Sequence, residues 1–225
     1  MNLSRLDHLF TKDELLTIEK SHVYVFGIGG VGASACLSLA RMGLREISVI
    51  DDDVITDSNL NRQAHAFNSS IGEKKVDVIK KLILDINPNC KVNTYYRRIT
   101  KENINDLIKT DGSFYVDAID DISGKLAIIT FCNKNNLRLI SSMGAGNRLD
   151  PTKVCISDIF KTENDPLAKC IRSELRKLNI KKLPVVWSTE VPVKTTSRTP
   201  SSAVFVPQTF GLTLSYYVIK EITEK

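Results

Sequence analysis

The side chains best suited to chemistry lie between residues 51 and 76. Asp51, Asp52 and Asp53 are followed by the runs SNLNRQ (residues 58–63) and GEKKV (residues 72–76). When a polyphosphate is attacked at phosphorus it expels a charged group, and cations aimed at its oxygens stabilise that charge. Arg62 and Lys75 are spaced to supply such cations. The stretch therefore predicts chemistry on a phosphate-bearing ligand.

The elements that would position these residues begin at residue 22. An apolar run at 22–26 predicts a buried strand, and it leads into GIGGVG (residues 27–32), which satisfies the pattern G-x-G-x-x-G. We expect a helix over 33–42, ended by Gly43, and a second strand over 46–50 that ends on Asp51. The glycines would let backbone amides approach phosphate at the start of the helix, and Asp51 could accept hydrogen bonds from a ribose.

Taken alone, this glycine pattern favours NAD or FAD. A dinucleotide is held mainly by backbone amides and needs few cations, whereas ATP carries more negative charge. Arg62 and Lys75 therefore favour ATP. They also speak against a non-enzymatic module that senses NAD or scaffolds a partner.

Together these motifs resemble the ThiF-like adenylating superfamily, which includes ubiquitin-activating enzymes and the adenylyltransferases of thiamine and molybdopterin synthesis. The resemblance continues into VDAID (residues 116–120). Further motifs, SSMGAGN (141–147), LDPTK (149–153) and DPLAK (165–169), are similar to the branch that cyclises threonylcarbamoyladenosine in tRNA. The likeness to that branch covers nearly the full chain.

The resemblance implies an ATP- and Mg²⁺-dependent ligase or dehydratase acting on tRNA next to the anticodon. Arg62, Lys75, Asp120 and Arg5 would be catalytic. The expected nucleotide ligands are Gly27, Gly29, Gly30, Gly32, Asp51, Asp53, Asn59, Arg62, Gln63, Lys75 and Asp120. The superfamily also implies a homodimer in which Arg5 reaches the ATP site, often that of the second subunit. It further implies a cysteine desulfurase or sulfur-acceptor protein as a partner.

In this branch a substrate carboxylate attacks the α-phosphorus of ATP, and an internal nitrogen of the same group then closes a ring and releases AMP. Proximity makes that second step fast without an enzyme nucleophile. The alternative activity is activation of the C-terminal carboxylate of a ubiquitin-like or sulfur-carrier protein. That reaction uses the same ATP site and often a cysteine, for which Cys170, between Lys169 and Arg172, is the candidate.

Two carboxylates follow the strand expected over 114–119. Carboxylates at that end of a parallel strand lie over the ligand crevice, and Mg²⁺ prefers carboxylate oxygen. Asp121 suits the N-cap of the next helix better than metal binding. Asp120 is therefore the predicted metal ligand.

Charge is shared unevenly along the chain. Residues 1–120 contain 15 Lys and Arg against 17 Asp and Glu, whereas residues 121–225 contain 16 against 9. A basic second half suggests a polyanionic partner, although a solvated basic surface is the plain alternative. The residues expected to contact tRNA phosphates are Lys169, Arg172 and Arg176 on a helix over 166–179, then Lys181 and Lys182, with Lys194 and Arg198 continuing the charge.

The remaining segments alternate between strand and helix. Strands are expected over 92–96, 137–142, 154–160 and 203–206, and helices over 73–86, 101–109, 125–135 and 208–221. This order predicts an α/β fold with a Rossmann-like, doubly wound, mainly parallel sheet. We expect one adenylating domain over 1–225, with a nucleotide-binding half at about 1–150 and a basic, substrate-facing half at about 151–225.

The cysteines and the uncharged runs bear on location. Five scattered cysteines without a CxxC pair favour a reducing cytoplasm and argue against the zinc site of many thiamine and molybdopterin relatives. Residues 21–40 and 199–219 are uncharged, but glycines interrupt the first run and Pro200 and Pro207 the second. We therefore expect no stable membrane insertion.

Overall fold

The computed structural model describes residues 1–111, 113–197 and 199–224. A seven-stranded sheet in the order β3-β2-β1-β4-β5-β7-β6 forms its centre. Every neighbouring pair is parallel except β6 with β7. The strands are β1 His22–Phe26, β2 Glu46–Asp51, β3 Lys91–Tyr96, β4 Phe114–Asp117, β5 Arg138–Ser142, β6 Val154–Asp158 and β7 Pro184–Ser188. The α/β fold with a doubly wound, mainly parallel sheet is confirmed.

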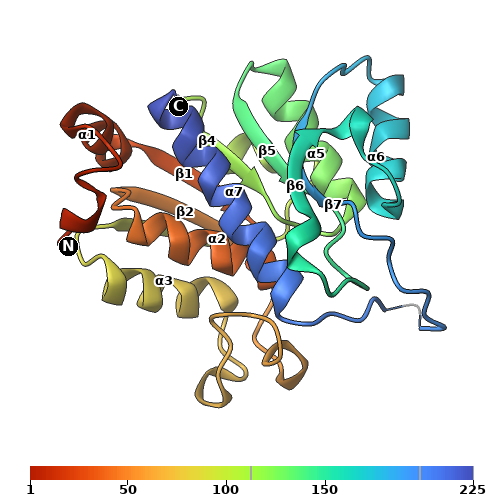
Figure 1. Cartoon of the computed structure of the whole chain (residues 1–225), viewed down its shortest axis with the longest axis horizontal. Helices are drawn as coiled ribbons and strands as arrows, with labels where there is room; N and C mark the ends of the chain where they lie inside the picture. The colour runs from red at the N-terminus through yellow and green to blue at the C-terminus, as the bar shows by residue number, and fades with distance from the viewer. Residues whose placement is uncertain (112, 198, 225) are drawn as a thin grey trace.

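Helices cover both faces of this sheet (Figure 1). One face packs on α1 Lys12–Lys20, α2 Gly30–Arg41, α3 Lys75–Ile86 and α7 Phe205–Thr223, and the other on α4 Ile104–Leu107, α5 Ile122–Lys134 and α6 Pro166–Lys177. Successive strand residues point to opposite faces. In β1, Val23 and Val25 join the first core while Tyr24 and Phe26 join the second.

Strand order sets where a ligand can bind. β1 lies between β2 and β4, so the chain runs to one side of β1 and later returns to its other side. In open α/β sheets, ligands bind outside the carboxyl ends of the strands where the order reverses in this way. The glycine turn after β1 lies at that point.

The end of the chain differs from expectation. The strand expected over 203–206 is wrong, because Phe205 and Val206 already belong to α7. Pro207 fits the first helical turn, whose N–H groups have no partner within the helix. α7 packs closely on α2, where a Cβ on Gly211 would lie 2.4 Å from the Val31 carbonyl oxygen. Apolar residues that predict a strand thus start a packed helix.

A strand was also missed in the segment before it. β7 lies in a segment where no strand was expected, and it inserts between β5 and β6. Trp187 in this strand is 6% exposed and belongs to the second core. In the described ranges, no helix has both the length and the apolar character needed to cross a membrane.

Candidate active site

The glycine turn packs against neighbouring backbone at its base and is open at its tip. Gly27 has a φ of +83°, and a Cβ there would lie 2.8 Å from the Ala118 carbonyl oxygen. A Cβ on Gly32 would lie 1.8 Å from the Gly27 carbonyl oxygen, so both positions require glycine. At Gly29, the N-cap of α2, a Cβ would meet no described atom within 4 Å beyond its chain neighbours. The N–H groups of this helix end are therefore open to a phosphate.

Asp51, the last residue of β2, braces this turn. Its Oδ2 accepts a hydrogen bond from the Ile28 N–H at 2.5 Å, and its Oδ1 accepts one from the Asp53 N–H at 2.8 Å. Burial raises the pKa of Asp51, and the charge of Lys75 and the two hydrogen bonds oppose this. An ionised carboxyl group offers about four acceptor positions. Asp51 can therefore hold the turn and still accept from ribose hydroxyls.

Lys75 supplies a buried cation beside Asp51. It is the first residue of α3, its side chain is only 6% exposed, and its Nζ lies 2.6 Å from Asp53 Oδ2. The Lys75 N–H also donates to the Asp53 carbonyl oxygen at 3.1 Å. The Asp53 side chain is 65% exposed. Both residues were predicted as nucleotide ligands, and the structure joins them as an ion pair.

Arg62 lies against the start of α2. A Cβ on Gly30 would be 3.2 Å from the Arg62 carbonyl oxygen and 3.7 Å from its Cγ. Its Nη1 donates to the Ser58 carbonyl oxygen at 2.6 Å and to Asn61 Oδ1 at 3.0 Å. These partners belong to its own loop, so the guanidinium is a cation held at the glycine turn.

The same loop buries three other polar residues. Asn59 Oδ1 accepts from the Thr56 N–H at 3.1 Å, so this predicted ligand also shapes the loop. Gln63 is buried, and its Oε1 has no hydrogen-bond partner among the described residues. His65 is fully buried, and neither ring nitrogen has a hydrogen-bond partner in the described chain. Burial, and then the charge of Lys75, lower the pKa of His65 to about 4. A single histidine in a polar loop gave no signal of such burial.

Carboxylates that could hold Mg²⁺ lie on both sides of β1. Oxygens of Asp51, Asp52 and Asp53 fall within 4.8 Å of one another, which suits a hard cation. Asp120 is exposed just past β4, while Asp121 caps α5, as expected, by accepting from the Gly124 N–H at 2.8 Å. Asp120 is thus free of that capping role, and its metal role stays a prediction.

A buried ion pair, not foreseen from the sequence, lies beneath this edge of the sheet. The Lys125 and Asp117 side chains are both 0% exposed, and Lys125 Nζ lies 2.8 Å from Asp117 Oδ2. Lys125 also donates to Ser141 Oγ at 3.2 Å and to the Ser142 carbonyl oxygen at 2.9 Å. The pair therefore ties α5 to the carboxyl ends of β4 and β5.

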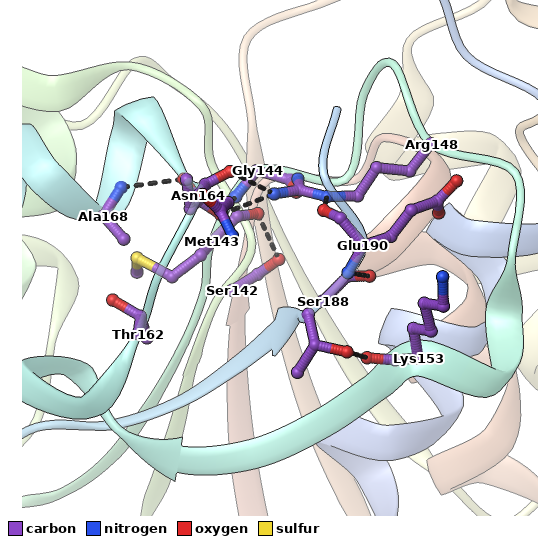
Figure 2. A network of polar contacts seen from close by, with 12 residues as sticks. Ser142, Met143, Gly144, Arg148, Lys153, Thr162, Asn164, Ala168, Ser188 and Glu190 are labelled. Carbon is purple, nitrogen blue, oxygen red and sulfur yellow. Dashed lines mark hydrogen bonds and ion pairs between the residues drawn. The ribbon is translucent and has the colours of Figure 1, made fainter. Parts of the chain in front are cut away.

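A second buried network fixes the loop after β5 (Figure 2). Gly144 donates its N–H to Asp165 Oδ2 at 3.0 Å, and its carbonyl accepts from Arg148 Nη1. Arg148 also donates to the carbonyl oxygens of Asn164, at 3.0 Å, and Glu190, at 3.1 Å. Asp165 is the N-cap of α6. The N-terminus of α6 is therefore held at the carboxyl end of β5.

The residues predicted to contact tRNA extend along α6 away from that point. Lys169, Arg176, Lys181 and Lys182 are exposed. Arg172 points inward instead, and its Nη1 donates to the Thr162 carbonyl oxygen at 2.9 Å. Their contacts with tRNA stay predictions. Lys194 is exposed as well, and Arg198 lies outside the described residues.

Arg5 is far from the glycine turn of its own chain. It is exposed in the short helix η1 Ser4–Leu6, next to Leu3. Leu3 packs at Gly43, where a Cβ would lie 2.7 Å from Leu3 Cδ1. Gly43 follows the C-terminus of α2, whereas the glycine turn lies at its N-terminus, roughly 18 Å away for a twelve-residue helix. Arg5 could therefore serve an ATP site only in another chain.

Comparison with known proteins adds two kinds of likeness. A model of the ThiF family matches residues 3–223. The tRNA threonylcarbamoyladenosine dehydratase of Bacillus subtilis (strain 168) is 38% identical over 237 residues, which covers 97% of this chain and 93% of the relative. The match thus extends over nearly the whole of both proteins.

Solved structures agree with the sequence match. The crystal structure of E. coli tRNA N6-threonylcarbamoyladenosine dehydratase, TcdA, in complex with AMP has a TM-score of 0.94 and 33% identity, covering 98% of this chain and 93% of that chain. The complex of the same protein with ATP has a TM-score of 0.91 and 31% identity, with the same coverage. Both of these similar structures hold an adenine nucleotide.

Proposed function

The chain belongs to the ThiF family, and we propose that it is an ATP-dependent enzyme that cyclises threonylcarbamoyladenosine in tRNA, acting as one adenylating domain. The observation that carries this proposal is the joining of an open glycine turn with Asp51, Arg62 and the buried ammonium of Lys75 at the sheet's reversal point. The similar E. coli protein, whose structures hold ATP and AMP, supports it.

The reaction has two steps. The carboxylate of the threonylcarbamoyl group attacks the α-phosphorus of ATP, and the bond from that phosphorus to the bridging oxygen breaks to release pyrophosphate. An internal nitrogen of the same group then attacks the acyl carbon and loses its proton. The carboxylate oxygen leaves with AMP, so the modified base loses one water overall.

The chain's own residues act on charge and position. The amides at Gly29 and Gly30 bind phosphate, and Asp51 accepts from the ribose, with Asn59 and Gln63 in the adjoining loop. Arg62 and Lys75 stabilise the charge that develops on the departing pyrophosphate. Mg²⁺ would neutralise further phosphate charge when bound, and we propose Asp120 as its ligand.

ATP with Mg²⁺ should stabilise the protein, and NAD should not. The cations at the turn match a triphosphate, and a ligand that binds only the folded state raises the melting temperature as its concentration exceeds its Kd. Thermal-shift titration measures this, with AMP as a matched control that lacks the outer phosphates. A shift with NAD but none with ATP–Mg²⁺ would refute the nucleotide assignment.

A thiol has no part in this reaction. Cys170 is half-buried on α6, and ring closure proceeds on the adenylate without a thioester. Cys170→Ser should therefore leave the yield of cyclised nucleoside near the wild-type value. A variant that forms adenylate but no product would instead favour activation of a carrier protein. The comparisons do not favour that alternative, and a sulfur-transfer partner stays a prediction from resemblance.

We further propose a cytoplasmic homodimer in which Arg5 reaches the partner's ATP site. Arg5→Ala and Lys75→Ala should each be inactive alone. After unfolding and refolding as an equal mixture, half the chains pair as mixed dimers with one intact site each, which restores about a quarter of the wild-type rate. Light scattering gives the mass in parallel. No recovery on mixing, or a fully active monomer, would exclude the shared site.

A further inference from the structure

The far end of α6 carries a hollow that the adenylation chemistry does not use. Its volume is about 330 Å³, and it is lined by Phe160, Arg176, Asn179, Ile180 and Lys181. These residues come from the segment after β6 and from the end of α6 with the turn that follows it. Figure 1 shows α6 and β6 on the side of the molecule away from α1. The hollow combines one aromatic ring, two cations and a side-chain amide.

Phe160 is held in place by its surroundings. It lies in the short helix η5 Ile159–Lys161 and is half-buried, and its N–H donates to Asp158 Oδ1 at 2.9 Å. Arg172 holds the next turn of chain by donating to the Thr162 carbonyl oxygen. By pointing inward, Arg172 therefore fixes the segment that presents the Phe160 ring.

The cations beside the ring are available to a ligand. The Arg176 guanidinium lies over the Phe160 ring, with 5.6 Å from its Cζ to the ring centroid. Arg176 and Lys181 are exposed, and neither forms an ion pair with a carboxylate in the described chain. Nearby Glu174 is engaged by Lys177 at 2.6 Å. The hollow therefore has a net positive charge around a planar apolar surface.

Single-stranded nucleic acid matches both properties. Its bases stack on aromatic rings and guanidinium planes, and its phosphates pair with adjacent cations. We infer that this hollow binds an unpaired base of the tRNA substrate, stacked at Phe160 and Arg176, with a neighbouring phosphate at Lys181. The inference rests on the proposed function and adds a second anchor to it.

The hollow is separated from the carboxyl ends of the strands by the length of α6. Asp165 holds the first turn of α6 at Gly144, beside the carboxyl ends of the strands, while the hollow lies past its last turn. A twelve-residue helix spans roughly 18 Å. The stacked base is therefore a few nucleotides from the adenosine that carries the reacting group, and it contributes to binding without contacting the reacting atoms.

Phe160→Leu removes the ring and keeps an apolar side chain. It should weaken tRNA binding on the order of tenfold, since stacking is worth about 1–3 kcal/mol per base. The dependence on salt should not change. Lys181→Gln should also weaken binding, and it should lower the slope against salt by about one unit because a phosphate contact is lost. Lys177→Gln is the control, because it removes a charge on α6 outside the hollow. It should not reproduce the weaker tRNA binding that follows from the loss of stacking.

A second variant separates stacking from folding. Phe160→Trp should keep wild-type affinity, and its added fluorescence should be quenched by unmodified tRNA, over the background of buried Trp187 given by the wild-type protein. In steady-state assays Phe160→Leu should raise KM for tRNA and leave kcat unchanged.

The outcomes distinguish the inference from the function on which it rests. If wild-type protein cyclises the tRNA nucleoside while Phe160→Leu binds tRNA normally and Phe160→Trp is not quenched, the stacking site is wrong and the function stands. The same holds if an acidic peptide competes for the hollow better than single-stranded RNA. If wild-type protein neither binds nor alters tRNA, both are wrong.

Discussion

Arg62→Ala and Lys75→Ala should each slow the exchange of pyrophosphate into ATP by about a hundredfold or more, the usual cost of removing one preorganised donor from a developing charge. Arg62 is held at the glycine turn by acceptors of its own loop, the Ser58 carbonyl and the Asn61 side chain. Its loss would remove the proposed phosphate ligand and little else. The fold should persist, which circular dichroism and the melting temperature would verify.

Lys75→Ala should also leave the fold intact, but for a different reason. Its loss leaves the Asp53 carboxylate without a partner, but that side chain is 65% exposed and water can solvate it. The cost therefore falls on catalysis more than on stability. Lys81→Ala is the matched control, since Lys81 lies on the exposed side of the same helix and pairs with Glu73. Near-normal exchange by either Arg62→Ala or Lys75→Ala would show that its cation does not act on the phosphates.

Lys125→Met should have the largest effect on stability. It leaves Asp117 fully buried without its cation, and breaking a buried pair on one side costs about 3–5 kcal/mol. Urea denaturation measures the free energy of unfolding. Lys134→Met, an exposed position on the same helix, should change it by less than about 0.5 kcal/mol.

The double change Asp117→Asn with Lys125→Met gives the matching test. It removes both buried charges, and Asn can still accept from Ser141, so much of the lost stability should return. A single Lys125→Met variant as stable as wild type would contradict the structural role assigned to this pair. A double variant that is less stable than the single Lys125→Met variant would also contradict it.

Local pattern predicted the elements that carry the nucleotide site. The apolar run before Gly27, the acidic end of β2 and the 3.6-residue period of α3 all act over a few residues, and each matches its prediction closely. Gly30 and Gly32 disguised the start of α2, because glycine weakens a helix prediction. Their reason is tertiary, since a Cβ on Gly32 would collide with the Gly27 carbonyl.

Features that depend on distant residues were not predictable in the same way. Asp117 meets Lys125 and Ser141 only when β4, α5 and β5 are assembled. The 203–206 segment has strand-forming residues, but packing on α2 makes its last two residues helical. Arg172 resembled its basic neighbours in the helical pattern, and only the chain path of η5 turns its guanidinium inward.

If this chain acts as we propose, it removes one water from threonylcarbamoyladenosine within tRNA at the expense of ATP. The most direct measurement is mass spectrometry of nucleosides from threonylcarbamoyladenosine-bearing tRNA after incubation with the protein and ATP–Mg²⁺. We predict a nucleoside lighter by one water, with AMP and pyrophosphate formed in equal amounts, and none without ATP or with Lys75→Ala. An unchanged nucleoside, in a reaction where ATP is nevertheless converted to AMP and pyrophosphate, would contradict the proposed cyclisation.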